Sequence, residues 1–345
     1  MRPNNYNILF DALSAPRVGA YKHYFGTHLT DEQLFGCYQW NESVSHAFFK
    51  VITLIEISMR NKMHFALSQH YHAEPKKIVN NFKVNNWVYV NYNTLGSARS
   101  CNWYNAQKNG KSVLSKKSLS KVHSVTHNQR NGSYWMGART PSPDDVVSSL
   151  TFGFWSSLVD KCKDIEWDIL LKDIFPKHRV TNSNQWTSDI ERKKLSYRLD
   201  LVRDVRNRIA HHEPIWKLGN LLSENPPLLN GQFNPQGQRV ISDGPTTTPQ
   251  ESIRRLANYY VKHTQLLRWM SQEIYDDFIG SSHHKHMLWL LSSEGLNAHI
   301  DRAKHLPISM TTCRFKRELK SILKGKKVTY LHKGGRNVIA TQPIQ

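Results

Sequence analysis

A long stretch of helical periodicity without helix breakers constrains the fold of this chain more than any other feature. The sequence contains no proline and no glycine between Cys37 and His72. Thr30 and Gln33 precede this stretch with the spacing of a capping box. Apolar residues recur at helical spacing through it, namely Leu34, Trp40, Val44, Ala47, Phe48, Val51, Leu54, Ile55, Met59, Met63 and Phe65. The pattern predicts one or two long packed helices over residues 30–71.

Three further helices are indicated later in the chain. Asp144 and Asp145 follow Pro143 and put acidic residues in the first turn of a helix. Apolar periodicity then predicts helices over residues 190–212 and 252–279. The predicted fold class is therefore all-α, a helical bundle.

Composition divides the chain into segments. The core helices are expected in residues 1–75 and 144–216, completed by a helix in 251–280; a basic, largely irregular insertion is expected at 76–143, an extended Pro- and Gly-rich loop at 217–250, and a basic extension at 281–345. Strand patterns are sparse, with weak candidates at residues 87–90 and 328–331.

The charge of the chain indicates a polyanionic partner. Lys and Arg number 47 against 27 Asp and Glu, which gives a net charge of +20. Such a field attracts nucleic acid more often than any other partner. The four cysteines, Cys37, Cys101, Cys162 and Cys313, are far apart and form no zinc or disulfide framework. With no signal-peptide pattern and no long apolar run, we expect a soluble cytoplasmic protein that does not enter the membrane.

The insertion combines cations with aromatic residues. No Asp or Glu occurs between Glu74 and Asp144. Cations can bind phosphates and aromatic rings can stack on unpaired bases, so the insertion is a candidate for contacting RNA. The alternative is a solvated insertion with a few aromatics packed on the body. The RNA-binding candidates are Lys76, Lys77, Lys83, Trp87, Arg99, Trp103, Lys116, Lys117, Lys121, Arg130 and Arg139, with Arg314, Lys316 and Arg317 in the C-terminal extension.

Residues 201–216, with the sequence LVRDVRNRIAHHEPIW, contain an arginine and a histidine separated by four residues. On a helix, Val202, Val205 and Ile209 form an apolar stripe. The opposite arc then carries Arg203, Arg206, Asn207 and His211. Pro214 disfavours helical geometry at the preceding residue, so the helix should end near His212.

A cation, an amide and a titratable imidazole at one helix end could cleave a phosphodiester. Arg206 could hold phosphate oxygens, Asn207 could orient the imidazole or the substrate, and His211 could transfer protons. His212 and Arg203 are auxiliary candidates, while Arg208 and Glu213 could form an ion pair. The alternative is an ordinary amphipathic helix with a solvated polar face, because so short a pattern is not specific.

A related run, Arg60-Asn61-Lys62-Met63-His64, has three residues between Arg and His. It could be a second half-site, or Glu56 and Arg60 could be a structural ion pair in a packed helix. The run His283-His284-Lys285-His286 is expected to be a solvated turn, so no metal site and no cofactor are predicted. No phosphate-binding glycine loop, nucleophile elbow or carboxylate pair is present.

Four blocks occur in a specific order between about residues 34 and 216. They are YQWN at 38–41 running into LIEISMRN at 54–61, LTFGFW at 150–155, IFP at 174–176 and RNRIAHHEP at 206–214. In order and spacing they resemble the bacterial Abi-like (abortive infection) proteins of the HEPN superfamily. The resemblance implies a helical HEPN fold and metal-independent endoribonuclease activity at a dimer interface, with the family motif on Arg206, Asn207 and His211.

Two functions follow as expectations. One is an RNA endonuclease of phage defence or of a toxin–antitoxin system, acting as a homodimer and controlled by a possible antitoxin. The other is an RNA-binding protein that forms a stable ribonucleoprotein with a structured non-coding RNA and cleaves little. A scaffold with an inactive HEPN fold is a third possibility.

Overall fold

The computed structural model describes residues 5–73, 95–108, 111–130, 133–136, 141–180 and 183–301, and beyond these residues 308–311, 313–314, 316–317, 329–333 and 336–341. Among the RNA-binding candidates, Lys76, Lys77, Lys83, Trp87 and Arg139 lie outside the described residues, as does the strand predicted at 87–90. The described part of the chain is mostly helical, as the sequence predicted.

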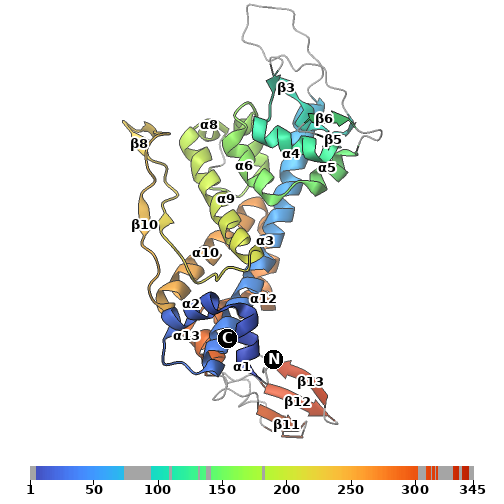
Figure 1. Cartoon of the computed structure of the whole chain (residues 1–345). Coiled ribbons are helices and arrows are strands. Elements are labelled where there is room, and N and C mark those ends of the chain that lie inside the picture. The colour runs from blue at the N-terminus through green and yellow to red at the C-terminus, as the bar shows by residue number, and fades with distance from the viewer. Residues whose placement is uncertain are drawn as a thin grey trace, which may run out of the picture.

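One helix, α3 (Asp31–Ala73), is 43 residues long and forms the axis of the bundle (Figure 1). It begins at the predicted capping box, in which the Thr30 amide donates to Gln33 Oε1 at 3.0 Å and the Gln33 amide donates to Thr30 Oγ1 at 3.3 Å. Most of the apolar residues in its helical pattern are buried in a single core cluster, but Phe65, which the pattern included, is exposed. After Gly36, α3 contains no Pro and no Gly, which lets it continue unbroken to Ala73 where two helices were equally possible.

The remaining helices pack along α3 and with one another. Before α3 come α1 (Tyr6–Leu13) and α2 (Ala15–Phe25); after it come α4 (Lys116–Thr126), α5 (Pro143–Ser149), α6 (Phe152–Lys161), α7 (Trp167–Ile174), α8 (Ser183–Trp186), α9 (Asp189–Ala210), α10 (Pro249–Met270), α11 (Gln272–Gly280), α12 (Ser282–Leu290) and α13 (Ser293–Ile300). The helix predicted over 252–279 is two helices, because Ser271 caps α11 and interrupts the pattern.

The bundle continues past residue 280, where the sequence analysis placed a basic extension. Trp40 Nε1 donates to the carbonyl oxygen of Leu290 at 2.8 Å. Gly36 allows α13 to approach α3, since a Cβ at Gly36 would collide with the carbonyl oxygen of His299. The run 283–286 is helical rather than a turn, and His284 Nδ1 lies 2.9 Å from the Tyr260 hydroxyl.

The described part of the insertion is ordered, in contrast to the largely irregular structure predicted. It contains the antiparallel pairs β1 (Gly96–Ser97) with β2 (Ser100–Cys101), β3 (Gln107–Lys108) with β4 (Lys111–Ser112) and β5 (His127–Arg130) with β6 (Ser133–Met136), the short helix η1 (Trp103–Asn105) and α4. Its apolar residues, among them Cys101, Trp103 and Val122, join the core cluster. This module sits at one end of α3 (Figure 1).

Residues 217–250 form an arm with strands rather than a plain extended loop. In this arm β7 (Leu221–Leu222) pairs with β10 (Ile241–Asp243), and β8 (Leu228–Leu229) pairs with β9 (Gln232–Phe233). Asn230 and Gly231 have φ values of 50° and 78°, as a two-residue hairpin turn requires. The arm runs beside the bundle, and β9 contacts α9 (Figure 1).

The C-terminal region contains a small sheet. Strand β11 (Ile308–Thr311) is parallel to β12 (Thr329–Lys333), which is antiparallel to β13 (Arg336–Thr341). The weak strand prediction at 328–331 overlaps β12. None of the helices in the described part of the chain combines the length and apolar character that crossing a bilayer requires.

Candidate functional site

Helix α9 carries Arg206 and Asn207 of the Arg-x4-His motif and ends at Ala210, directly before His211. Val202 and Val205 are buried, as the apolar stripe predicted, and Ile209 packs against the core cluster. Helix α9 contacts α6, α3 and α10. The motif therefore stands on a helix that the core holds from several sides.

The end of α9 is a Schellman turn built by the two histidines. The His212 amide donates to the Ile209 carbonyl at 3.0 Å, and the Glu213 amide donates to the Arg208 carbonyl at 2.8 Å. His212 has a φ of 54°, a left-handed conformation that usually belongs to glycine at this position. The helix thus stops at the predicted place, and Arg208 pairs with Glu213 at 3.7 Å.

The segment that follows is fixed by three other helices. Its key contact is buried: the Ile215 amide donates to Asn41 Oδ1 of α3 at 2.9 Å. The Trp216 ring stacks on Tyr24 of α2 at 4.3 Å between centroids. Ser252 Oγ of α10 donates to the Trp216 carbonyl at 2.7 Å. Asn41, to which the sequence analysis gave no role, therefore ties the end of the motif helix to the axis of the bundle.

The three motif side chains do not share one surface within a single chain. His211 is exposed at the helix end, and its amide donates to the Asn207 carbonyl at 2.9 Å. Arg206 is partly buried, and its Nε atom is shielded from solvent without a hydrogen-bond partner. Five residues of helix separate Arg206 and His211 by about 140° around the axis.

This position of Arg206 corrects the prediction that it lies on the solvent arc. Leu199 is fully buried and widens the apolar face of α9 beyond the stripe read from the sequence. Arg206 lies at the border of this wider face, whereas Asn207 and His211 lie on the polar side.

A cluster of cations lies where α4, α6 and α9 meet. A Cβ at Gly153, in the first turn of α6, would lie 3.9 Å from both Arg203 Cδ and Lys121 Nζ. Burial lowers the pKa of Lys121, and so do the positive charges of Lys117 and Arg203. Arg203 also pairs with Asp200 at 2.8 Å. The N-terminus of a helix adds a partial positive charge to such a cluster, which suits a phosphate group.

The second motif lies in a different environment. His64 is buried, and its Nδ1 accepts a hydrogen bond from Trp103 Nε1 at 3.0 Å. An indole only donates, so the ring proton of neutral His64 belongs on Nε2, which lies 2.9 Å from Ser100 Oγ. Ser100 in turn donates to Asp144 Oδ1 at 2.6 Å. Burial lowers the pKa of His64, although Asp144 opposes this effect.

These contacts favour the structural interpretation of the Arg60 run. Both ring nitrogens of His64 are engaged inside the protein, which leaves no free position for a substrate. In the part of the chain that the structure describes, Arg60 contacts the neighbouring Asn61 at 3.4 Å rather than the predicted partner Glu56. The sequence offered no sign of the Trp103, Ser100 and Asp144 contacts, which join segments far apart in the chain.

Trp103 requires a correction among the RNA-binding candidates. It is fully buried, so no base can stack on it. Of Arg130 the structure describes the backbone in β5. The candidates that are exposed or partly exposed are Arg99, Lys116, Lys117, Lys121, Arg314, Lys316 and Arg317.

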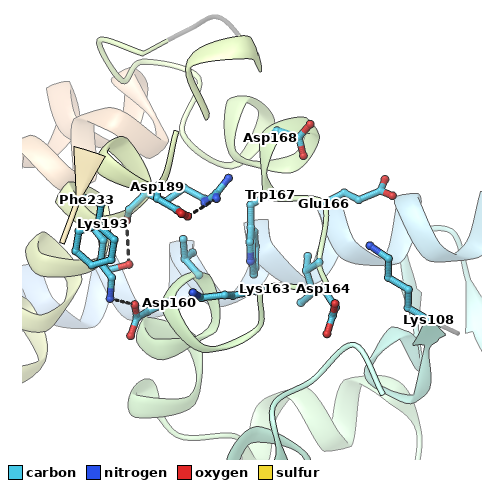
Figure 2. A pocket seen from close by; sticks show the side chains of 14 residues that line it. Lys108, Asp160, Lys163, Asp164, Glu166, Trp167, Asp168, Asp189, Lys193 and Phe233 are labelled. Atoms are coloured by element: carbon cyan, nitrogen blue, oxygen red, sulfur yellow. Dashed lines mark hydrogen bonds and ion pairs between the residues drawn. The ribbon is translucent and has the colours of Figure 1, made fainter. Parts of the chain in front are cut away.

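A hollow of about 210 Å³ lies between α6, the start of α7 and α9 (Figure 2). Asp160 binds Lys193 across it, and Arg192 donates to Asp189 at 2.6 Å. Although burial raises the pKa of Asp160, hydrogen bonds from Lys161 and Lys193 lower it overall. These charges satisfy one another, so we assign the hollow a structural role.

Comparison with known proteins gives one match. The family model described as "Abi-like protein" matches residues 2–217. This range contains α3, α9, the Asn41 anchor and all four sequence blocks. Searches of the curated proteins and of the solved structures found no match.

Proposed function

The chain belongs to the family of Abi-like proteins, and on this premise we propose that it is a metal-independent endoribonuclease of phage defence or of a toxin–antitoxin system. The observation that carries the proposal is the exposed His211 beside Asn207, at a helix end anchored by Asn41. In this proposal the core helices form a fold of the HEPN type.

The chemistry follows from the groups at this helix end. The 2′-hydroxyl of RNA loses its proton and its oxygen attacks the adjacent phosphorus. The bond from phosphorus to the 5′-oxygen then breaks, and that oxygen takes up a proton. The products are a 2′,3′-cyclic phosphate and a 5′-hydroxyl. His211 transfers protons in this reaction, which contributes about 10²- to 10⁴-fold to the rate.

A second copy of the chain completes the site. One imidazole cannot serve as base and acid in the same step, and Arg206 points about 140° away from His211 on its own helix. A twofold dimer brings two α9 ends together, so that one protomer supplies the base and the other the acid. Arg206 of either protomer then stabilises the charge on the phosphorane.

The RNA backbone reaches this site over the cations of α4 and α9. Lys117, Lys121 and Arg203 lie together beside the first turn of α6. The charges acting on Lys121 come from cations, so its ammonium is available to a phosphate. The net charge of +20 supports the same conclusion for the whole chain.

The test is cleavage of labelled structured and unstructured RNA in EDTA by wild type and His211→Ala. We expect cleavage by the wild type only, with 2′,3′-cyclic phosphate ends. His46→Ala is the matched control, since His46 is an exposed histidine on α3 far along the chain from the motif. Equal cleavage by wild type and His211→Ala would contradict the role of His211.

A second candidate function is a stable ribonucleoprotein with a structured non-coding RNA and little cleavage. The cation cluster and the net charge favour it, because they serve binding as well as catalysis. RNA carried through a low-salt purification, with no cleavage in the assay above, would support it over the nuclease.

A further inference from the structure

A hollow of about 270 Å³ lies between α9, the arm and α10. The α9 wall includes Tyr197, Asp200, Asp204 and Arg208, which follow one another at three or four residues and therefore share one face of the helix. Arg239 lies on the arm and Tyr259 on α10. The hollow adjoins the motif, because Asp204 lies seven residues before His211, about 10 Å along the axis and nearly on the same side.

The acidic groups that line this hollow differ in whether they form ion pairs within the protein. Glu224 is satisfied by Arg198 at 2.8 Å and by Lys262 at 2.7 Å, and Asp200 pairs with Arg203. Asp204, in contrast, lines the hollow, is exposed, and forms no ion pair in the part of the chain that the structure describes.

Arg208 is also incompletely satisfied. Its Nε is shielded from solvent and has no hydrogen-bond partner, and its terminal nitrogen approaches Glu213 only to 3.7 Å. The Asp204 carboxylate and the terminal nitrogens of Arg208 lie one helical turn apart on α9 and line the hollow, so an acceptor and a donor are available to a ligand.

The walls suit a planar ligand. The guanidinium of Arg239 lies over the Tyr197 ring at 3.7 Å and is held there by two hydrogen bonds to the Ser223 carbonyl, at 3.1 and 2.8 Å. A guanidinium plane fixed in this way offers its other face for stacking. Leu201, Leu218 and Leu221 add apolar surface.

We propose that this hollow binds a guanine base. Asp204 accepts from N1–H and the N2 amino group, and Arg208 donates to O6 and N7. Guanine alone among the four RNA bases carries two adjacent donors on its Watson–Crick edge, which a single carboxylate can accept together. Arginine is the side chain that most often pairs with O6 and N7. The base can belong to an RNA chain or to a free nucleotide.

If it belongs to RNA, the inference rests on the proposed nuclease function, and the hollow places a guanosine beside the cleavage site. If it belongs to a free nucleotide, the hollow is a regulatory site on the motif helix. Both sources share the same contacts with Asp204 and Arg208.

The experiment measures binding in the His211→Ala background, so that cleavage does not interfere. GMP, IMP, AMP, CMP and UMP are titrated by calorimetry. We expect GMP to bind at least about 10-fold more tightly than AMP, CMP and UMP, and Asp204→Asn to reduce GMP binding about 10-fold or more. IMP lacks the N2 amino group and should bind more weakly than GMP. Asp173→Asn, an exposed acid on α7, is the matched control and should bind GMP like its parent.

Short oligopyrimidines with and without one guanosine distinguish the two sources. Guanosine-dependent binding of the oligonucleotide that exceeds binding of GMP indicates RNA, and binding of GMP that the oligonucleotide does not improve indicates a free nucleotide. Equal binding of all four bases, or no effect of Asp204→Asn in a variant with an unchanged melting curve, overturns the inference. Selective GMP binding without any cleavage by wild type would support the guanine site and contradict the nuclease function. Cleavage by wild type together with equal binding of GMP, AMP, CMP and UMP would contradict the guanine site and support the nuclease function.

Discussion

The last third of α3 and the end of α9 carry similar runs of residues in opposite surroundings. His64 is enclosed, with one ring nitrogen bound by Trp103 and the other beside Ser100. His211 stands exposed at a helix end whose backbone turns back through His212. His64 lies on the side of the 43-residue helix α3 on which Trp103 and Ser100 pack, whereas His211 lies at a helix end and remains accessible. Accessibility, more than the Arg-to-His spacing, separates a candidate for proton transfer from a structural residue.

The largest expected effects come from replacing the two histidines by alanine, because one substitution should reduce cleavage and the other should reduce stability. His211→Ala should lower cleavage about 10²- to 10⁴-fold and leave the Tm nearly unchanged. His64→Ala should leave the buried Trp103 indole N–H without an acceptor and remove the hydrogen bond from His64 Nε2 to Ser100 Oγ, and the unsatisfied indole alone costs about 1–3 kcal/mol. Its folded fraction should still cleave RNA at close to the wild-type rate. The measurement combines thermal unfolding with cleavage rates at a temperature where both variants are folded.

The outcome that would break the comparison is a loss of cleavage in His64→Ala without a loss of stability. That result would make the α3 run a second chemical site despite its burial.

Asn41 provides the next test, because it connects the two regions. Asn41→Leu keeps the size of the side chain but leaves the buried Ile215 amide without an acceptor, which should cost about 1–3 kcal/mol. The same loss should free the chain after His211 and lower cleavage. Urea unfolding and the RNA assay measure the two effects. Asn61→Leu, at an exposed asparagine on the same helix, should change stability by less than about 0.5 kcal/mol.

Local signals in the sequence predicted the features that depend on neighbouring residues. The unbroken apolar periodicity predicted α3, and the capping box at Thr30 and Gln33 predicted where it begins. Pro214 predicted where α9 ends. The hairpin at Asn230 and Gly231 also had a local signal, an Asn-Gly pair between apolar residues, but the proline-rich composition around it favoured a loop.

The features that were not predicted depend on contacts between distant segments. The hydrogen bond from Ile215 to Asn41 spans 174 residues. Trp103 looked like a base-stacking residue because composition cannot distinguish an exposed aromatic from one that packs on α3. The hollow beside Asp204 exists because the arm folds back along α9, and no pattern in either segment specifies that.

Replacing His212 should have a smaller effect on stability, and this effect should be a gain where the substitutions above cause a loss. His212→Gly should relieve the left-handed backbone and stabilise the protein by up to about 1 kcal/mol. Cleavage should be unchanged, because His211 and not His212 transfers the protons. Ala210→Gly is the matched control, since the same replacement inside the last turn should destabilise by up to about 1 kcal/mol. Differential scanning calorimetry compares the variants, and a loss of cleavage in His212→Gly would assign the chemistry to both histidines.

The smallest effect is a change in how stability depends on pH. Burial lowers the pKa of His64, so the unfolded chain, with a histidine pKa of about 6.5, binds the proton more tightly than the folded protein. The stabilisation by neutral His64 is complete above about pH 6.5 and is lost as the pH falls below that value.

His178 and His263, whose pKa values burial lowers to about 4, act in the same direction and are present in both proteins compared. His64→Gln preserves a donor and an acceptor but cannot titrate, so its Tm should fall less than that of wild type between about pH 7.5 and pH 5.5, one unit above and one unit below the unfolded value. Parallel Tm curves would mean that folding leaves the pKa of His64 unshifted, which would contradict the burial of its neutral ring against Trp103 and the contrast with His211 drawn from it.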